Sequence, residues 1–491
     1  MAKVQKTARK KHFKRIFRQL LSSFTANFHH LLAVDIIKRI LFSLILSIIA
    51  FQQPMAQTLS ERLDTLLKDS IFEDSDASLI VYDLDDDTLL YSYRENKLCR
   101  PASVMKVATA AVALFRLGSD YTVDTELYEK KNAGNGRNIY VRGEIDPLFN
   151  EEDLAELINS VTKGKIDTLY ADISFSDSIY WGPGWSWDDT PWEFQPYISP
   201  LMLCGGCVNI TATPSKKGCA PTIKCSPESS FYTIANEATS REKSGEKFTI
   251  LRDWLQGSNV IRLRGDCNVP KSVKMNLYPS QEFFITALRE RLAERGIKVE
   301  HTAYSRTPDD ATIVYSKQRD IKEIVKEALM ESNNLCAEAL CYHIGALFDK
   351  KPVRQKYGPE IITSFIEYSL DINANFNVAD GSGLSLYNYL SADIILQILR
   401  RTHCSNDVYE IIKNSLPTMG VSGTLKERGT TSTAQGRIHA KTGSVKGIAT
   451  LAGYVDAANG HTLAFVIMNQ NTLNIKNARK WQDRVCDALC Q

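Results

Sequence analysis

The sequence lacks a strong charge of one sign, and it lacks a long hydrophobic run. Its 491 residues carry 59 basic and 57 acidic side chains, so the formal net charge is only +2. With 26 glycines, 16 prolines, 44% hydrophobic and 24% charged residues, the composition excludes a collagen-like or disordered chain. Internal repeats and long low-complexity tracts are also missing. The composition therefore indicates an ordinary globular protein with room for two or three domains.

The small net charge is the sum of two unlike parts. Residues 1–56 hold ten basic groups and one acid, which leaves 59 − 10 = 49 basic and 57 − 1 = 56 acidic groups in residues 57–491, a net charge of −7. Nucleic-acid binding requires a concentrated basic surface that neutralises phosphates. A mildly acidic body therefore argues against a nucleic-acid partner.

One apolar run, residues 40–51, follows two basic residues, Lys38 and Arg39. The run has twelve residues, whereas a helix that crosses a bilayer needs roughly 20. A positive flank, a short apolar core and a small residue at Ala56 are typical of a secretory signal peptide. Residues 1–56 are therefore predicted to be a signal peptide, and the body is expected in the periplasm or another extracytoplasmic space. If the leader stays uncleaved, it is the only expected attachment to a membrane.

The cysteine content allows three interpretations. Eleven cysteines are present, and the odd number leaves at least one unpaired. Five of them gather in the middle of the chain: Cys204, Cys207, Cys219, Cys225 and Cys267. In an exported protein these can form one or two disulfides that stabilise a small inserted domain. Unpaired buried thiols and a zinc site are the alternatives, although the spacing after the C-x-x-C pair matches no common zinc pattern.

Periodicity predicts an α/β domain that is interrupted by a β-rich insertion. Alternation around the acidic turn at 85–87 predicts a β-hairpin over 77–93, and an apolar run predicts a helix over 103–117. Short strands, turns and aromatic residues dominate from about 121 to 275. Further helices are predicted over 58–69, 279–296, 321–348, 357–370, 391–402, 405–415 and 474–490. Further strands are predicted over 437–442, 447–456 and 461–468.

Three short motifs point to serine-based acyl transfer. They are Ser103-x-x-Lys106, Ser332-x-Asn334 and Lys441-Thr442-Gly443. A serine hydroxyl is a weak nucleophile that needs an adjacent base. Residues three apart share one face of a helix, so Lys106 can place its amine beside Ser103 Oγ. Lysine acts as a base where burial or neighbouring cations favour its neutral form, and an apolar helix follows Ser103.

Each motif has a structural alternative when it is considered alone. Ser103 and Lys106 could be a chance match on a core helix, Ser332 or Asn334 could simply cap a helix, and residues 441–443 could be an ordinary strand end. Their order in the chain, each in fitting local structure, argues against coincidence.

With these motifs, residues 58–490 resemble a serine D-alanyl-D-alanine carboxypeptidase/endopeptidase of the class C low-molecular-mass penicillin-binding type. The phrases at 331–338, 380–385 and 416–425 support the resemblance. Ser103 and Ser332 are 332 − 103 = 229 residues apart, whereas related β-lactamases and simpler carboxypeptidases lack so large an insertion. The resemblance implies an α/β (α+β) penicillin-binding/β-lactamase-like fold, in which helices flank an antiparallel sheet and a large β-rich domain is inserted.

The resemblance also implies domain limits. After the leader, residues 57–122 would form the first part of the penicillin-binding domain and residues 309–491 its second part. Residues 123–308 would form the inserted domain, with a smaller nested domain at about 205–267.

The resemblance implies a role for each motif residue. Ser103 would be the acylated nucleophile and Lys106 its base, while Ser332 and Asn334 would relay protons and hold the substrate amide. Lys441 would favour the terminal carboxylate of the substrate electrostatically.

The strand after Lys441 would bind the rest of the substrate. Thr442 and Ser444 would hydrogen-bond the carboxylate, and Gly443 would let the strand approach the substrate backbone closely. The backbone N–H groups of Ser103 and Ser444 would form the oxyanion hole. Peptidoglycan stem peptides and β-lactams are the expected binding partners. No metal ion or organic cofactor is implied, and the oligomeric state is left open.

Two further positions are less certain members of the site. Asp172 could match a carboxylate of the inserted domain that faces the substrate amine, or it could be an ordinary turn aspartate. Leu386 stands where some relatives have an arginine suited to a diaminopimelate side chain, so recognition of the stem peptide is expected to differ. The tryptophans at 181, 185, 187 and 192 could stack on glycan or pack beneath the inserted domain.

Two rival functions remain. A β-lactamase-like hydrolase is disfavoured by the distance between the first two motifs and by the lack of a convincing deacylating Glu loop after Ser332. A catalytically silent muropeptide-binding scaffold is disfavoured because it has no need of all five motif residues. The leading hypothesis is a peptidoglycan D-Ala-D-Ala carboxypeptidase that is also a DD-endopeptidase.

Overall fold

The computed structural model describes residues 11, 14–22, 38, 57–132, 136–243 and 245–491. The chain divides into two units, residues 1–58 and residues 59–491. Residues 14–22 of the first unit are helical. The apolar run at 40–51 and the predicted cleavage point after Ala56 lie outside the described residues. Within the described ranges, no helix combines the length and the apolar character that a membrane span requires.

A five-stranded antiparallel sheet joins the beginning and the end of the second unit. Its strand order is β16-β17-β18-β1-β2. The bounds are Asp76–Asp83 for β1, Thr88–Tyr93 for β2, Ile438–Val445 for β16, Ile448–Asp456 for β17 and Thr462–Gln470 for β18. The predicted hairpin is confirmed, since β1 pairs with β2. β1 also pairs over its whole length with β18, from the far end of the chain.

Helices cover both faces of this sheet, because alternate strand residues are apolar on each side. Ile80 and Val466 pack with one group of helices, while Leu79 and Phe465 pack on the opposite face. The first group comprises α3 (Met105–Leu117), α6 (Ile321–Met330), α7 (Asn334–Ala346), α8 (Tyr357–Ser364), α9 (Ala392–His403) and α10 (Asn406–Ser415). The opposite face is covered by α2 (Leu59–Leu66) and α11 (Ile475–Leu489).

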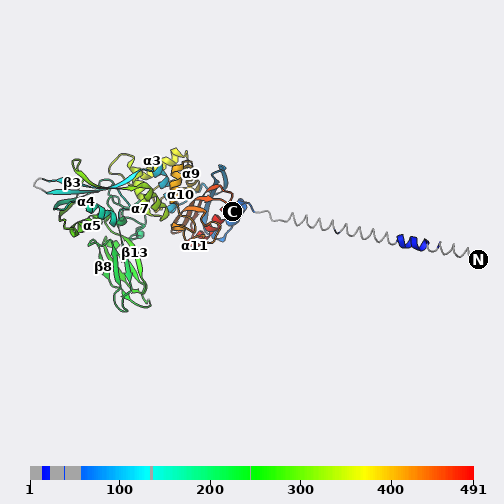
Figure 1. Ribbon diagram of the computed structural model, residues 1–491, viewed down its shortest axis with the longest axis horizontal. Helices are drawn as coiled ribbons and strands as arrows, with labels where there is room; N and C mark the ends of the chain where they lie inside the picture. The colour runs from blue at the N-terminus through cyan, green and yellow to red at the C-terminus, as the bar shows by residue number, and fades with distance from the viewer. Residues whose placement is uncertain (1–10, 12–13, 23–37, 39–56, 133–135, 244) are drawn as a thin grey trace, which may run out of the picture. The chain divides into compact units, whose positions relative to one another are not determined.

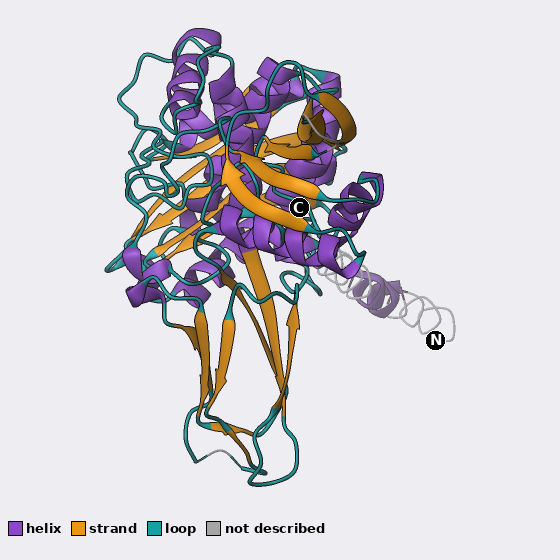
Figure 2. Cartoon of the chain, turned by 90° about the vertical axis from the view of Figure 1, so that its left-hand side faces the viewer, coloured by secondary structure: helices purple, strands orange, loops and turns teal. Residues whose placement is uncertain are grey.

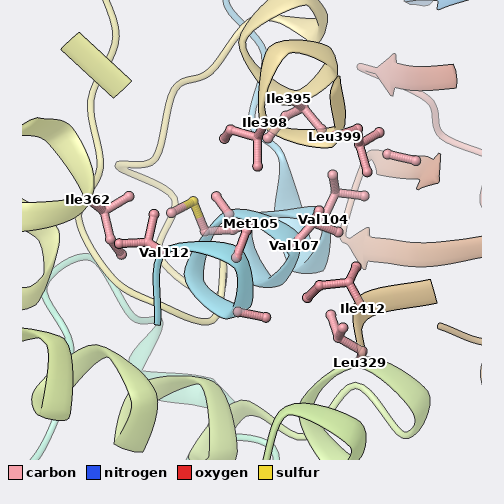
Figure 3. Packing of buried hydrophobic residues seen from close by; sticks show 14 of the residues in the cluster. Val104, Met105, Val107, Val112, Leu329, Ile362, Ile395, Ile398, Leu399 and Ile412 are labelled. Carbon is pink, nitrogen blue, oxygen red and sulfur yellow. The ribbon is translucent and has the colours of Figure 1, made fainter. Parts of the chain in front are cut away.

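Helix α3 lies inside the apolar core rather than on its surface. Figure 3 shows Met105, Val107 and Val112 of this helix surrounded by apolar side chains of other elements, among them Ile362 and Ile395. All residues from 105 to 114 are buried. Since α3 has no solvent-facing side over these turns, its polar residues must find partners inside the protein.

A second five-stranded sheet lies between the two parts of the first sheet in sequence. Its order is β14-β5-β4-β3-β15. The bounds are Thr122–Lys131 for β3, Arg137–Gly143 for β4, Ile166–Asp172 for β5, Val299–Tyr304 for β14 and Thr312–Asp320 for β15. Helices α4 (Glu151–Ser160) and α5 (Ser280–Glu294) contribute apolar side chains to its core. The sheet continues past residue 308 to Asp320, and the predicted domain limits remain predictions.

Smaller sheets between Cys207 and Asn276 extend beyond the second sheet. Figure 1 labels β8 and β13 in this part of the chain, and Figure 2 shows its long strands at the bottom of the view. One has the order β13-β6-β7, another β10-β11-β8, and β12 pairs with β9. The bounds are Cys207–Thr213 for β6, Thr222–Ser226 for β7, Thr233–Asn236 for β8, Thr239–Ser240 for β9, Thr249–Arg252 for β10, Val260–Arg264 for β11, Asp266–Cys267 for β12 and Lys271–Asn276 for β13. An antiparallel sheet flanked by helices, with a β-rich insertion, confirms the predicted fold class.

The single helix predicted over 321–348 is wrong, because the chain forms α6 and α7 with a break between them. Ser332 has φ 61°, a left-handed conformation that ends a helix. Asn333 then caps α7 by accepting a hydrogen bond from the backbone N–H of Cys336 at 3.2 Å. The helix predicted over 357–370 also changes character, since a π-helical turn, Phe365–Ser369, follows α8.

The expected disulfides are not formed. All eleven cysteines lie in the described residues, and all are free. The middle group is spread over separate strands, with Cys207 in β6, Cys225 in β7 and Cys267 in β12. Within the described part of the chain, only Asp83, Asp86 and His461 lie close enough together to hold a metal ion. Free thiols, one of the three alternatives, are therefore what the structure shows.

Strand β16 packs closely against the short 3-10 turn η2 (Ala102–Val104), which leads into α3. Gly443 permits this contact, because a Cβ at that position would lie 2.1 Å from Thr450 Oγ1 and 3.0 Å from Ser103 N. Thr450 Oγ1 in turn donates to the carbonyl oxygen of Pro101 at 2.8 Å. The absence of a side chain at Gly443 therefore sets how closely the sheet approaches Ser103.

We expect Gly443→Ala to destabilise the fold by about 1–3 kcal/mol, because the added methyl group must push the strand or the turn away. The measurement is the free energy of unfolding in urea. The same substitution is also made in a Thr450→Ala protein, which lacks the Oγ1 atom nearest to the added methyl group. In that protein Gly443→Ala should lower the free energy of unfolding by less than it does in the wild type. A Gly443→Ala change within about 0.5 kcal/mol of wild type would show that the strand has room.

Candidate active site

Lys106 brings three separate segments of the chain together. Its Nζ donates hydrogen bonds to Ser103 Oγ at 2.9 Å, to Asn334 Oδ1 at 2.6 Å and to the carbonyl oxygen of Ser382 at 2.7 Å. The side chain is fully buried. Three acceptors match the three N–H groups of a lysine ammonium. The first two predicted motifs therefore meet at one nitrogen atom.

The loop after residue 379 holds the third acceptor in place. Asp380 is fully buried and accepts hydrogen bonds from the backbone N–H groups of Gly383 at 2.8 Å and Ser385 at 2.6 Å. It also accepts from the indole Nε1 of Trp185 at 2.9 Å. These bonds fix the loop, which presents the carbonyl oxygen of Ser382 to the lysine.

The protonation of Lys106 is shifted toward the neutral amine. Burial lowers the pKa of Lys106 to about 7, although the charges of Asp380 and Glu338 act in the opposite direction. Burial and the neighbouring charge of Asp380 raise the pKa of Glu338 above its usual range. Near neutral pH, a substantial share of Lys106 is therefore able to accept the proton of Ser103 Oγ.

Lys441 is also fully buried, on strand β16. Its Nζ donates to the carbonyl oxygen of Thr442 at 2.8 Å. Burial, and next the charge of Lys106, hold the pKa of Lys441 well below its usual range, while Glu331 opposes the shift. The effect of Lys106 on Lys441 shows that the third motif lies in the same electrostatic environment as the first.

The remaining residues of the third motif reach an open cavity. Thr442 Oγ1 lies 2.7 Å from Thr424 Oγ1, and Ser444 Oγ accepts a hydrogen bond from Arg479 Nη2 at 2.8 Å. Gly443, by contrast, is turned toward the backbone of Ser103. Its small size therefore serves the packing of the strand against the turn that carries the predicted nucleophile.

Two cavities meet at Ser332. The first has a volume of about 510 Å³ and is lined by Ser103, Ser332, Thr442 and Ser444. Charged side chains complete its lining: Glu427, Arg428, Lys476, Arg479, Lys480 and Asp483. Asp483 is paired with Arg428 at 2.6 Å, so the positive charges prevail on this side.

The second cavity has the opposite charge balance. It has a volume of about 560 Å³, and Ser332 and Asn334 are among its lining residues. Its charged lining residues are Glu193, Glu327, Glu331 and Lys274. A substrate bound across Ser332 therefore meets a basic cavity at one end and a mainly acidic cavity at the other.

Two residues at the site have strained backbones. Ala102, directly before Ser103, has φ 46°, and Ser332 has φ 61°. Non-glycine residues in the left-handed region cost free energy and are held by their surroundings. In both places the strain coincides with a residue that positions a hydroxyl group of the site.

Sequence reasoning missed the basic residues of helix α11. Lys476, Arg479 and Lys480 all line the first cavity. Their spacing of three and four residues would place them on one face of a helix, which is the signal that could have found them. That this helix begins beside the predicted nucleophile depends on tertiary packing and cannot be read from local sequence.

Asp172 and Leu386 lie outside both cavities. Asp172 is buried and accepts hydrogen bonds from the backbone N–H groups of Ser174 at 3.1 Å and Thr307 at 2.7 Å. This is the turn role that was its structural alternative. Leu386 is 37% exposed, and its carbonyl oxygen accepts from Arg100 Nε at 3.1 Å. Neither residue is among the described residues that line the cavities.

Comparison with known proteins identifies the family. The model of the D-Ala-D-Ala carboxypeptidase 3 (S13) family matches residues 59–489. The chain belongs to the S13 carboxypeptidase family. The resemblance drawn from the three motifs to the class C penicillin-binding type is thereby confirmed.

S13 relatives match most of the chain. A D-alanyl-D-alanine carboxypeptidase from Actinomadura sp. (strain R39) is 27% identical over 437 residues, which cover 84% of this chain and 80% of that protein. The crystal structure of penicillin-binding protein 4 (dacB) from Haemophilus influenzae has a TM-score of 0.73 at 22% identity, covering 84% of this chain and 95% of that one. A structure of the same protein complexed with a novel β-lactam has a TM-score of 0.70 at 20% identity, covering 86% and 98%.

A more distant structure has a similar fold. A predatory peptidoglycan endopeptidase from Bdellovibrio bacteriovorus has a TM-score of 0.50 at 17% identity, covering 84% of this chain and 92% of that one. These structural likenesses place the S13 chain in the penicillin-binding/β-lactamase-like fold.

We expect the carboxypeptidase activity of this S13 protein to rise with pH around neutrality. At pH values below the pKa of Lys106, which is about 7, this lysine carries a proton and cannot accept one from Ser103. The value of kcat/KM should therefore fall about tenfold for each pH unit below that pKa. The measurement is the release of D-alanine from a pentapeptide between pH 5 and 9, with circular dichroism at each pH as a control for folding. A value of kcat/KM that stays constant from pH 5.5 to 8.5 would contradict the role of Lys106 as the base.

Proposed function

We propose that this S13 protein is a peptidoglycan D-Ala-D-Ala carboxypeptidase that works through a serine acyl-enzyme and also acts as a DD-endopeptidase. The observation that carries the proposal is the hydrogen bond of 2.9 Å between Lys106 Nζ and Ser103 Oγ, made by a buried lysine whose pKa is about 7. A nucleophile beside a base with a pKa near the working pH is the arrangement that covalent acyl transfer needs.

The proposed reaction has two steps. Ser103 Oγ attacks the carbonyl carbon of the terminal D-Ala–D-Ala bond and passes its proton to Lys106 Nζ. The backbone N–H groups of Ser103 and Ser444 donate to the oxyanion that develops. D-alanine leaves with a proton, and water then attacks the ester carbonyl, which releases the shortened peptide and restores Ser103. Asn334, held by Lys106 at 2.6 Å, is placed to position the peptide amide.

The first cavity is suited to the terminal carboxylate of the substrate. Arg479, which already donates to Ser444 Oγ at 2.8 Å, adds a positive charge to the one that Lys441 on the same strand as Ser444 is predicted to supply. Guanidinium groups bind carboxylates through two parallel hydrogen bonds. Thr442 and Ser444, with Arg479 behind them, then form the carboxylate site.

Endopeptidase activity fits the space on both sides of Ser332. A cross-linked substrate places a second peptide where D-alanine would leave, and cavities of about 510 and 560 Å³ meet at this residue. The Bdellovibrio relative is named a peptidoglycan endopeptidase, and cross-linked muropeptides are therefore the second substrate to test.

The same site is proposed to react with penicillin. A β-lactam has a strained amide and a carboxylate in the positions of the D-Ala–D-Ala bond and its terminal carboxylate, so Ser103 would open the ring and form a stable ester. Because the substrate is in the cell wall, we also propose that residues 1–56 direct export of the body out of the cytoplasm.

We expect fluorescent penicillin to label the wild-type protein and not Ser103→Ala, because that variant lacks the only hydroxyl that contacts Lys106 Nζ among the described residues. D-alanine release from a pentapeptide and cleavage of a cross-linked muropeptide should both be lost in the variant. Ser244→Ala, which changes the serine of another S-x-x-K match at 244–247, is the control and should keep both activities.

Each failure in this experiment has a defined meaning. Labelling of Ser103→Ala, or no labelling of the wild type, would contradict the nucleophile. Labelling without turnover of either peptide would favour the silent scaffold, and rapid hydrolysis of the penicillin would favour a β-lactamase.

We expect Arg479→Ala to raise KM for a pentapeptide roughly tenfold, since a hydrogen bond to a charged group contributes about 1.5–3 kcal/mol. Arg484→Ala on the same helix is the matched control, because Arg484 is paired with Asp69 and does not line the cavity. A substrate with an amidated C-terminus should be processed equally by wild type and Arg479→Ala. An unchanged KM in Arg479→Ala would remove this residue from the carboxylate site.

A further inference from the structure

A third cavity, outside the two that meet at Ser332, has walls made mainly of aromatic rings. Its volume is about 480 Å³. The aromatic lining residues are Trp181, Trp185, Trp187, Tyr197, Trp254 and Tyr278. Trp187 is 70% exposed and Trp181 is 44% exposed, although large aromatic side chains are usually buried in protein cores. Exposed aromatic rings gathered around a cavity mark a surface that binds a ligand.

The rings that line the cavity pack into two groups, one of Trp187 with Trp254 and one of Trp181, Tyr197 and Tyr278. The centroids of Trp187 and Trp254 are 5.5 Å apart, and the rings are inclined at 36°. Trp181 and Tyr278 are nearly parallel, with centroids 6.3 Å apart. The cavity therefore offers flat apolar faces on more than one side.

A buried arginine belongs to the same cavity. Arg252 is only 3% exposed, and its Nη2 donates to Asn276 Oδ1 at 2.9 Å while Nη1 donates to the carbonyl oxygen of Ser258 at 3.0 Å. Its Nε is buried and finds no hydrogen-bond partner among the described residues. A buried donor without a partner costs about 1–3 kcal/mol, so a ligand that accepts from Arg252 would remove that cost.

The other polar groups of the lining are neutral. Gln195 and Asn276 are each 3% exposed, and Thr190 is half-buried. Among the described residues that line the cavity, none is acidic. The lining thus combines aromatic faces with amide, hydroxyl and guanidinium groups that can donate to oxygen atoms of a ligand.

The cavity and the active site share a wall. The segment before residue 198 carries Gln195, which lines the aromatic cavity, and Phe194, whose carbonyl oxygen accepts from Asn334 Nδ2 at 2.5 Å. Trp185, another wall residue, donates to Asp380 in the loop that contacts Lys106. A polymer that binds in the aromatic cavity would therefore lie directly beside the place where its peptide is cut.

We propose that this aromatic cavity binds an N-acetylhexosamine residue of the glycan strand to which the stem peptide is attached. Sugar rings have apolar C–H faces that stack on aromatic side chains, and their hydroxyl and acetamido oxygens need hydrogen-bond donors. Arg252 Nε has no partner among the described residues, and Gln195 Nε2 has a second N–H besides the one that donates to the carbonyl oxygen of Ser186, so these two side chains supply such donors beside the rings. The inference rests on the proposed function, because a peptidoglycan substrate carries glycan next to the peptide that Ser103 would cut.

The test is direct binding of a peptide-free sugar to the full chain. Isothermal titration calorimetry with N-acetylchitotetraose should show saturable binding to the wild type, and Trp187→Ala or Trp254→Ala should weaken it at least tenfold. Leu255→Ala is the matched control, since Leu255 is 74% exposed, adjoins Trp254 and does not line the cavity. Cellotetraose, which lacks the acetamido groups, should bind more weakly.

Binding and catalysis are measured separately, so the two proposals can fail separately. Ser103→Ala should bind N-acetylchitotetraose as the wild type does. Sugar binding without penicillin labelling would overturn the proposed function alone. The glycan assignment would be overturned by absent binding, by equal binding to Trp187→Ala and wild type, or by equal affinity for cellotetraose. Trp187 is mostly exposed, so Trp187→Ala carries the test if Trp254→Ala does not fold.

Discussion

The burial of one amine, that of Lys106, is the constraint on which the rest of the site depends. An ionisable group inside an apolar core is tolerated only when its hydrogen-bonding groups are satisfied. Ser103, Asn334 and Ser382 provide these partners, and they come from the start of α3, the start of α7 and the loop after residue 379. The packing that buries α3 therefore also decides where α7 and the loop must lie. The same burial lowers the pKa of Lys106 to about 7, so the packing of the core and the protonation of this amine have one physical origin.

The insertion between the two parts of the first sheet contributes to the site rather than merely extending from it. Its residue Phe194 accepts a hydrogen bond from Asn334, and Trp185 donates to Asp380. A substitution in the insertion can therefore affect Lys106 through Asn334 and through the loop that carries Ser382, which are two of the three segments that contact its amine.

Charge is divided between the two cavities that meet at Ser332, since cations of the last helix line one cavity and glutamates line the other. Orientation of a substrate across Ser332 would follow from these opposite charges before any specific contact forms.

Sequence patterns predicted the structural features that depend on residues close together in the chain. The spacing of Ser103 and Lys106 on a helix, the hairpin around the acidic turn and the alternation of the last strands were all readable, because each depends on neighbours in the sequence. The break at Ser332 was missed when one helix was predicted over 321–348, although the polar run at 331–334 interrupts the apolar pattern where the left-handed residue lies. The free state of the cysteines depends on which strands adjoin one another. Arg479 was missed because its place beside Ser444 arises from the docking of α11. The two alternatives for Asp172 were both left open, because a turn aspartate and a ligand-binding one look alike in sequence.

The pairing of β1 with β18 affects the order in which parts of the protein can fold during synthesis. Asp76 and Gln470 are register partners, so β1 finds this neighbour in the sheet only near the end of synthesis. Contacts between residues so distant in sequence form late and slowly, because a long loop must first close. Ser103 is made in the first quarter of the chain, yet the cavity that it lines lacks Lys476, Arg479 and Lys480 until α11 has emerged. The lining of this cavity is therefore complete only after the last helix has docked.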